Sequence, residues 1–172
     1  MKSVTRAIGR FFDLEDPRRN VLREQWDLLS RVPGGRRLFS LAVGRAAPYT
    51  GSIHARVLEL SVGHSRVEMH DEPSLRNHLR CVHAVALVNL AELTGNVAIA
   101  YSLPPTARFI VAGLSIEYLK KSRGTITAVS APPQVLDAEK REYEVPVVLS
   151  NAQGEVVARA SLRTLVGPKR GA

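Results

Sequence analysis

One carboxylate lies in the most apolar stretch of the chain. Residues 82–101 are rich in Ala and Leu and contain no Lys or Arg, so no helical neighbour can neutralise Glu92. A carboxylate in such surroundings is unfavourable to bury unless it is paired, protonated or facing a ligand cavity. This position favours a general base or a nucleophile. Two alternatives stay open: Glu92 lies at a solvent-exposed flank of the helix, or a distant arginine pairs with it.

Further polar groups lie in the same stretch. Its composition predicts a helix, and the double proline at 104–105 predicts where that helix ends. At 100° per residue, Asn89, Glu92 and Asn96 fall on one strip of the helix. The sequence therefore places a carboxylate and two amide side chains along a single line.

His83 stands at the predicted start of this helix, where the backbone amides of Ala84 and Val85 have no acceptor within the helix. Such amides can donate to an anion or to a polarised carbonyl oxygen. Ala84 and Glu92 are eight residues apart, about 12 Å along one helix, so a single helix cannot place both at one reacting carbon. Two antiparallel copies of the helix, related by a two-fold axis, could bring them together. The chemistry thus predicts a homodimer with two sites at its interface.

Length and composition indicate one domain, or one domain with an appendage. The chain has 172 residues, 45% of them hydrophobic, which is enough for a proper core and too much for a disordered chain. Its single cysteine excludes an internal disulfide framework and agrees with a reducing cytosol, so we expect a cytoplasmic protein. We expect neither a transmembrane segment nor a signal peptide, because no apolar run has the required length and flanks.

The positive charge is concentrated near the N-terminus. Of the formal charge of +8, residues 1–47 supply +5, with ten Lys or Arg against five Asp or Glu. Such an arm could steer the protein to phosphates on nucleic acid, on a membrane or on a soluble ligand. The alternative is a solvated helix surface. The arginines lack the regular interleaving with aromatic residues that single-strand binding needs, so no nucleic-acid partner is expected.

The remaining segments predict a sheet wrapped around the long helix. A helix that is apolar on nearly every side cannot lie on a surface. We therefore expect an α+β fold in which a curled antiparallel sheet of about six strands surrounds this helix, preceded by N-terminal helices. Strand-like runs cover residues 53–60, 66–70, 108–119, 125–131, 141–149 and 156–166, and helix-like runs cover residues 20–32 and 36–44.

Local signals set the expected boundaries. The pair Asp16-Pro17 predicts the start of the first helix, and Pro146 predicts an edge strand or a bulge. The predicted organisation is an N-terminal helical extension over residues 1–47, a sheet-and-helix domain over 48–167 and a disordered tail over 168–172.

The spacing of Asn77, His83-Ala84 and Glu92 resembles the active-site signature of hotdog-fold acyl-CoA thioesterases, particularly the phenylacetate-degradation and hydroxybenzoyl-CoA types. In that pattern an amide side chain and a histidine at the helix start precede the acid by fifteen and nine residues. Residues 110–124 resemble the long strand of that family and the turn after it. Residues 48–53, 77–79 and 89–92 resemble a bacterial subgroup of hotdog proteins of poorly defined function. The resemblance covers roughly residues 48–166 and implies that the sheet-and-helix domain is a hotdog domain.

The resemblance implies a role for each matching residue. Glu92 would activate water or attack the thioester carbonyl, and the amide of Ala84 would polarise the carbonyl oxygen. Asn77 would position the water or the thioester, and His83 would support the substrate carbonyl. Asn96 matches a position where the hydroxybenzoyl type has a water-orienting hydroxyl residue. The implied substrate is an acyl-CoA, with coenzyme A as part of the substrate and no separate cofactor.

The basic turn after the long strand is a candidate clamp for the phosphates of coenzyme A. It carries Lys120, Lys121 and Arg123, whose cations could bind phosphate oxygens. The alternative is an ordinary charged loop tip. The implied assembly is a homodimer or a dimer of dimers.

Other residues carry less chemistry. No metal is assigned, because His54, His64, His70 and His78 form no metal-ligand spacing with a carboxylate. Cys81 has no evident base and is predicted to be a small buried thiol.

Two departures from the signature leave a second function open. Ala84 and Val85 stand where that signature has two glycines, which narrows the approach of a thioester. The alternative function is therefore a non-catalytic hotdog module that binds acyl-CoA or a fatty acyl ligand.

Overall fold

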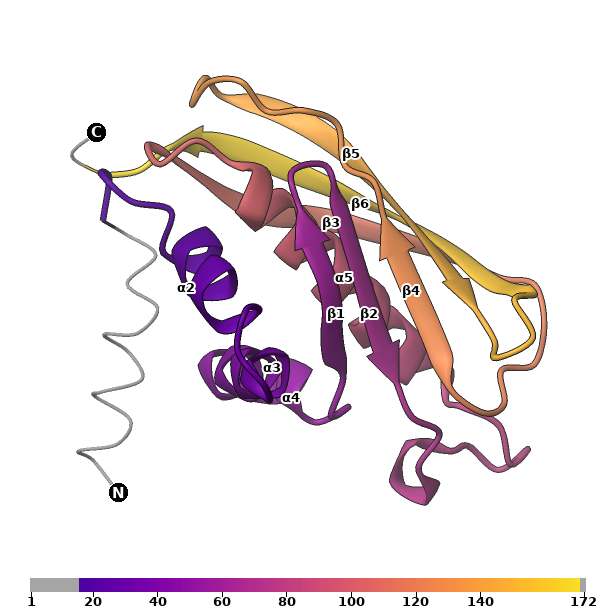
Figure 1. Cartoon of the computed structure of the whole chain (residues 1–172). Helices are drawn as coiled ribbons and strands as arrows, with labels where there is room; N and C mark the ends of the chain where they lie inside the picture. Colours follow the sequence, from indigo (N-terminus) through magenta and orange to yellow (C-terminus); the bar gives the residue numbers. More distant parts are fainter. Residues whose placement is uncertain (1–15, 171–172) are drawn as a thin grey trace.

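The computed structural model describes residues 16–170; residues 1–15 and 171–172 lie outside the described part. Within it, helices come first, then a hairpin, a long helix and four further strands, in the order that the sequence predicts (Figure 1). The elements are α2 (Val21–Leu29), α3 (Gly35–Ala46), α4 (Pro48–Gly51), β1 (Arg56–Ser61), β2 (His64–Met69), a 3-10 turn (Pro73–Leu75), α5 (Ala84–Ser102), β3 (Ala107–Tyr118), β4 (Ile126–Ser130), β5 (Arg141–Ser150) and β6 (Val156–Pro168).

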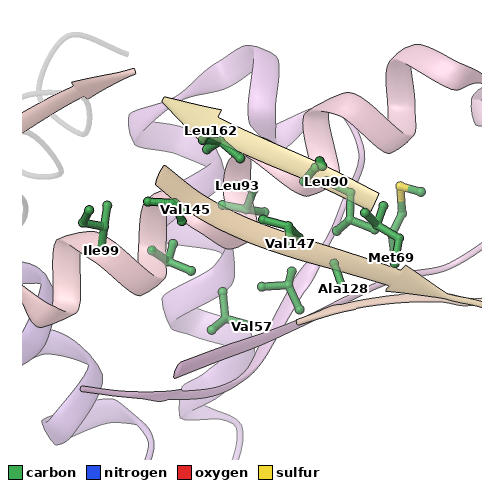
Figure 2. Packing of buried hydrophobic residues seen from close by; sticks show 14 of the residues in the cluster. Val57, Met69, Leu90, Leu93, Ile99, Ala128, Val145, Val147 and Leu162 are labelled. Atoms are coloured by element: carbon green, nitrogen blue, oxygen red, sulfur yellow. The ribbon is translucent and has the colours of Figure 1, made fainter. Parts of the chain in front are cut away.

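The six strands form one antiparallel sheet in the order β1-β2-β4-β5-β6-β3. The sheet curls around α5, and the apolar side chains between them form a continuous core. Figure 2 shows part of this core, in which side chains of α5 meet those of the sheet; the labelled residues are Val57, Met69, Leu90, Leu93, Ile99, Ala128, Val145, Val147 and Leu162. The predicted α+β architecture, a six-stranded antiparallel sheet around a central helix, is confirmed.

Close packing holds α5 against the middle of the sheet. A Cβ at Gly95 would lie 2.9 Å from the Leu162 side chain and 3.3 Å from that of Val145, so the absent side chain lets the helix approach β5 and β6. Among the described helices, α5 alone has the length and apolar character of a membrane span. Most of its residues are buried in the domain, which is the pattern of a core helix.

The first described helix starts later than predicted. Asn20 is the N-cap of α2, and its side-chain oxygen accepts the amide of Arg23 at 3.0 Å. Asp16 instead accepts the amide of Arg18 at 2.9 Å within a turn, so the predicted start at Asp16-Pro17 is wrong. The amide nitrogen of Asn20 also donates to the Ala100 carbonyl at 2.8 Å, which ties α2 to the end of α5.

The helices α3 and α4 cover one edge of the sheet. The hydroxyl of Ser40 on α3 accepts the amide of Val57 on β1 at 2.9 Å. The short helix α4, which the sequence analysis does not predict, lies against α3 through two glycines: a Cβ at Gly51 would lie 2.5 Å from the Gly44 carbonyl oxygen. The opposite edge is β3, which pairs with β6 alone among the strands within residues 16–170. One margin of the sheet is therefore covered and the other is open.

Two boundaries follow from local pairing. β4 ends at Ser130, opposite Val147, so Pro146 has a strand neighbour only on the β6 side; a proline is tolerated there because that part of β5 is a local edge. At the C-terminus, the Lys169 ammonium donates to the carbonyls of Asp16 at 2.8 Å and Arg19 at 2.9 Å. Lys169 is therefore held against the domain, although the predicted domain ended at residue 167.

Candidate functional site

A free backbone amide lies at the start of α5. His83 caps the helix, because its Nδ1 accepts the amide proton of Val85 at 3.1 Å. The amides of Ala86 and Leu87 bond to the His83 carbonyl, whereas the amide of Ala84 has no acceptor within residues 16–170. The expectation that both Ala84 and Val85 offer free amides is therefore wrong for Val85, since the cap uses its N–H.

The same cap fixes the tautomer of the histidine. A ring nitrogen that accepts a hydrogen bond carries no proton, so the neutral ring of His83 has its proton on Nε2. The side chain is exposed, which leaves the Nε2–H available to donate. His83 and Ala84 thus offer two donors at one helix end, and both can stabilise a developing negative charge.

Asn77 lies in the loop that leads into α5. Its Oδ1 accepts the amide of Leu79 at 2.9 Å and the thiol of Cys81 at 3.4 Å, and its backbone amide donates to the Cys81 carbonyl at 2.9 Å. The carbonyl end of the side chain therefore shapes the loop, and the Nδ2 group, which donates to no described atom, remains for a ligand. The thiol of Cys81 is buried, as predicted.

β3 and the turn after it reach the same helix end. The carbonyl of Ser122 accepts the amide of Val82 at 2.8 Å, and the hydroxyl of Tyr118 donates to the Ala84 carbonyl at 3.2 Å. Partial burial raises the pKa of the Tyr118 hydroxyl. The sequence analysis missed this tyrosine, although its position just before the basic turn could have indicated it.

The cations of this turn differ in their contacts. Lys120 pairs with Glu155 at 2.7 Å, and the hydrogen bond from this lysine holds the pKa of Glu155 below its usual range. Lys121 and Arg123 are exposed and have no acidic partner in the described part of the chain. Of the three cations, Lys121 and Arg123 are thus free to bind a phosphate. Lys120 would first have to break its ion pair with Glu155, which costs little because exposed ion pairs stabilise a protein only slightly.

One stripe of α5 is not buried by the other described residues. Apart from Ala84, every residue of the helix that is not buried belongs to it: Val85, Val88, Glu92, Asn96 and Ala100. Their spacing of three and four residues puts them on one face. Glu92 is half-buried, and no described residue forms an ion pair or hydrogen bond with it. The arginine partner considered above is therefore not found among residues 16–170.

The two amide residues near Glu92 behave differently. Asn89 is buried and donates from Nδ2 to the Tyr49 carbonyl at 3.1 Å, so it holds α4 onto α5 instead of joining the stripe. Asn96 is one turn beyond Glu92, and its Oδ1 is buried without a partner in the described chain.

A single chain brings together only part of the predicted site. Asn77, His83, Ala84 and the turn after β3 gather at the start of α5. Glu92 lies about 12 Å further along the same helix by its rise per residue, with Asn96 one turn beyond it. Within the described residues, no group of three or more His, Cys, Asp or Glu side chains is placed to hold a metal ion.

Comparison with known protein families assigns the chain. The model of a family described as a domain of unknown function, DUF4442, matches residues 35–166. The chain belongs to the DUF4442 family. The match includes α3 and α4 as well as the sheet and α5, so the helices that cover the β1 edge are part of the family's domain. A sequence search among curated proteins finds no relative.

Several solved structures share the fold of this DUF4442 domain. A structural-genomics protein, APC5556, is 29% identical, with a TM-score of 0.74 over 86% of this chain and 98% of its own. PA5026 of Pseudomonas aeruginosa, described as a probable thioesterase, is 23% identical, with a TM-score of 0.67 over 80% of this chain and 97% of its own. Thioesterase HI1161 of Haemophilus influenzae is 13% identical, with a TM-score of 0.64 over 71% of this chain and 84% of its own. The fold is the hotdog fold of thioesterase-family proteins, which confirms the resemblance found in the sequence.

Proposed function

We propose that the protein is an acyl-CoA thioesterase. The proposal rests on one observation: α5 carries two incomplete half-sites. Its start has the free donors of His83 and Ala84, and its unburied stripe has the half-buried Glu92, which has no partner among the described residues. Each half supplies what the other lacks for hydrolysis of a thioester. The shared fold with thioesterase-family structures supports the same reaction class.

The two halves meet if two chains associate through β3. This strand has twelve residues and an unpaired edge, and Ile110 on it is 66% exposed. A long open edge is a template for pairing with another strand. Pairing of two β3 edges around a two-fold axis would extend the sheet and bring the unburied stripes of two α5 helices face to face. Val85, which is 49% exposed, and the half-buried Val88 lie on that stripe and would gain apolar contacts in such an interface.

In such a dimer the thioester carbonyl oxygen accepts hydrogen bonds from the Ala84 amide and from Nε2 of His83. Glu92 of the other protomer takes a proton from water, whose oxygen forms the new bond to the carbonyl carbon. The tetrahedral oxyanion is stabilised by the same two donors. Its collapse breaks the carbon–sulfur bond, and the thiolate leaves with the proton that Glu92 holds. In the alternative route, Glu92 attacks the carbon directly and the carbon–sulfur bond breaks, so that the thiolate leaves and an anhydride forms. Water then hydrolyses this anhydride and regenerates the Glu92 carboxylate.

Further groups suit the two ends of an acyl-CoA. Lys121 and Arg123 lie beside the start of α5, where they can meet phosphates of the coenzyme A portion. Toward the other end of the helix, Ala100 of the stripe lines a cavity of about 670 Å³ between α2 and β3. Much of its wall is apolar, as an acyl chain requires; the apolar residues include Val21, Leu22, Leu103, Phe109 and Ile110.

The decisive measurement is free-thiol release from a panel of acyl-CoA substrates. We expect turnover by the natural chain and a loss of at least about a hundredfold in Glu92→Ala and Glu92→Gln, because neither variant can accept the proton or attack the carbon. Glu59→Gln is the matched control, since this exposed carboxylate lies on β1 and does not line the proposed acyl cavity. Unchanged turnover in both Glu92 variants would remove this residue from the mechanism.

One observation favours a second candidate function. Val85 is 49% exposed and stands beside the free amide of Ala84, so its isopropyl group narrows the approach to the donors. A module that binds an acyl-CoA or a fatty acyl ligand without hydrolysing it would tolerate this obstruction. Binding of acyl-CoA with no thiol release over the whole panel would support that function.

A further inference from the structure

The segment that builds α3, α4 and the start of β1 carries positive charge only. Residues 28–58 contain five arginines and no Asp or Glu. Four of the five arginines belong to α3 or to the first residue of β1, and α3 and α4 lie beside β1 in the structure (Figure 1). A segment with five arginines and no carboxylate of its own attracts anions, although Glu72 from outside it contacts His54 at 3.1 Å.

The outer face of α3 combines these charges with exposed leucines. Phe39 is buried and marks the inner side of the helix. Arg37, Leu41 and Arg45 follow one another at four-residue spacing, which places them together on the opposite side. Leu38 and Leu41 are 53% and 49% exposed. A helix that presents arginines and large aliphatic side chains on one exposed face is typical of binding to a membrane surface.

A groove continues this face onto the sheet. It has a volume of about 680 Å³ and lies between α3, α4 and the start of β1. Arg37, Arg45 and Arg56 line it and are exposed, whereas its buried apolar lining includes Val57 and Leu93. None of the described residues that line the groove is acidic. It can accept a group that is anionic at one end and apolar beside it.

The three groove arginines are not engaged by the chain itself. No ion pair or side-chain hydrogen bond of Arg37, Arg45 or Arg56 is formed with any residue in the range 16–170. The cavity beside α2 gives the contrast: there Lys169 bonds to two carbonyls and Arg141 pairs with Glu139. The groove arginines therefore keep their full capacity to bind phosphate oxygens.

We propose that this face binds the surface of a lipid bilayer that contains anionic phospholipids. A lipid phosphate occupies the groove between the three arginines, and Leu38 and Leu41 enter the boundary between headgroups and acyl chains. The long arginine side chains keep their charged ends at the headgroup level while their methylene stems contact apolar groups. Lipid is favoured over nucleic acid because the exposed leucines gain an apolar partner only at a membrane.

The test is co-sedimentation of the full chain with vesicles of phosphatidylcholine, with and without phosphatidylglycerol. We expect binding only to vesicles that contain phosphatidylglycerol, and weaker binding as salt is raised. Arg37→Glu should weaken binding by about tenfold, because it replaces an attraction by a repulsion at the membrane surface. Leu38→Ser should also weaken binding, since it removes the apolar contact.

Arg159→Glu is the matched control: Arg159 is an exposed arginine of β6 with no ion pair in the described structure. It changes the net charge equally and should leave binding within about twofold. Equal loss in the two charge variants, equal binding to neutral vesicles, or binding to duplex DNA but not to vesicles would each overturn the proposal. The measurement uses no thioester, so its outcome is independent of whether the protein hydrolyses one.

Discussion

The Nδ1 of His83 accepts the amide proton of Val85 at 3.1 Å, so one side chain both caps α5 and presents a donor from its other ring nitrogen. The two roles can be separated by mutation. His83→Asn keeps a good cap but removes the Nε2–H, so we expect nearly unchanged thermal stability and a loss of turnover. His83→Ala removes both, and should in addition lower the free energy of unfolding by about 1 kcal/mol. Denaturant unfolding and thiol release measure the two effects, and equal turnover in the natural chain and His83→Asn would contradict the donor role.

The free amide of Ala84 can be deleted without disturbing the helix. Ala84 is the first residue of α5, where proline is well tolerated, and the preceding residue has φ −64° and ψ 140°, which suits a following proline. Ala84→Pro should lower turnover by about 10²- to 10³-fold with little change in stability, because one carbonyl-polarising donor is lost. Ala84→Gly keeps the amide and is the control. Full activity in Ala84→Pro would show that this amide contributes nothing.

Mixing two inactive variants tests whether the site is shared between chains. In a heterodimer of Ala84→Pro and Glu92→Gln, one site has the intact Ala84 of one chain and the intact Glu92 of the other. Random pairing at equal amounts should therefore restore about a quarter of the natural activity. If both groups act within one chain, no heterodimer has an intact site, and the mixture stays inactive. An affinity tag on one variant, with co-purification of the untagged variant, confirms that the subunits have exchanged.

The contact between α3 and α4 leaves no room for a methyl group at Gly51. A Cβ there would lie 2.5 Å from the Gly44 carbonyl oxygen, which is backbone and cannot move aside cheaply. Gly51→Ala should lower the free energy of unfolding by about 1–3 kcal/mol. Gly167→Ala is the control, because its Cβ would meet only the Lys140 side chain at 3.5 Å. Equal stability of the two variants in denaturant unfolding would show that α4 adjusts freely.

Hydrophobic patterning predicted the architecture, because a helix that is apolar on nearly all sides has few ways to be buried. The strands and the central helix were accordingly found close to their true bounds. Helix boundaries that depend on side-chain caps were harder to predict from the sequence. Asp16 and Asn20 are both residue types that cap helices well, and only the tertiary contacts of the folded chain determine which of them does so. The helix α4 was not predicted, because a segment of four residues is too short to show the periodic spacing of apolar residues that indicates a helix.

The candidate site was predicted as a set of residues and not as a set of contacts. Spacing could place Glu92 and Asn89 on one strip, but it could not reveal that Asn89 holds Tyr49 of α4. Nor could it reveal that Lys120 pairs with Glu155, since 35 residues separate them in the chain. Such long-range contacts depend on how the strands are ordered in the sheet, and this order is not encoded in any local pattern.

The two edges of the sheet differ, since α3 covers the β1 edge and no described strand covers the β3 edge. This difference limits how many copies of the chain could associate by pairing of edge strands. At β1 the hydroxyl of Ser40 already occupies the Val57 amide, and α3 lies along that strand. Strand addition can then proceed from one side alone, so growth by this route terminates after a single addition. If copies associate through β3 as proposed, α3, which carries the arginine face, would also limit this association to two copies.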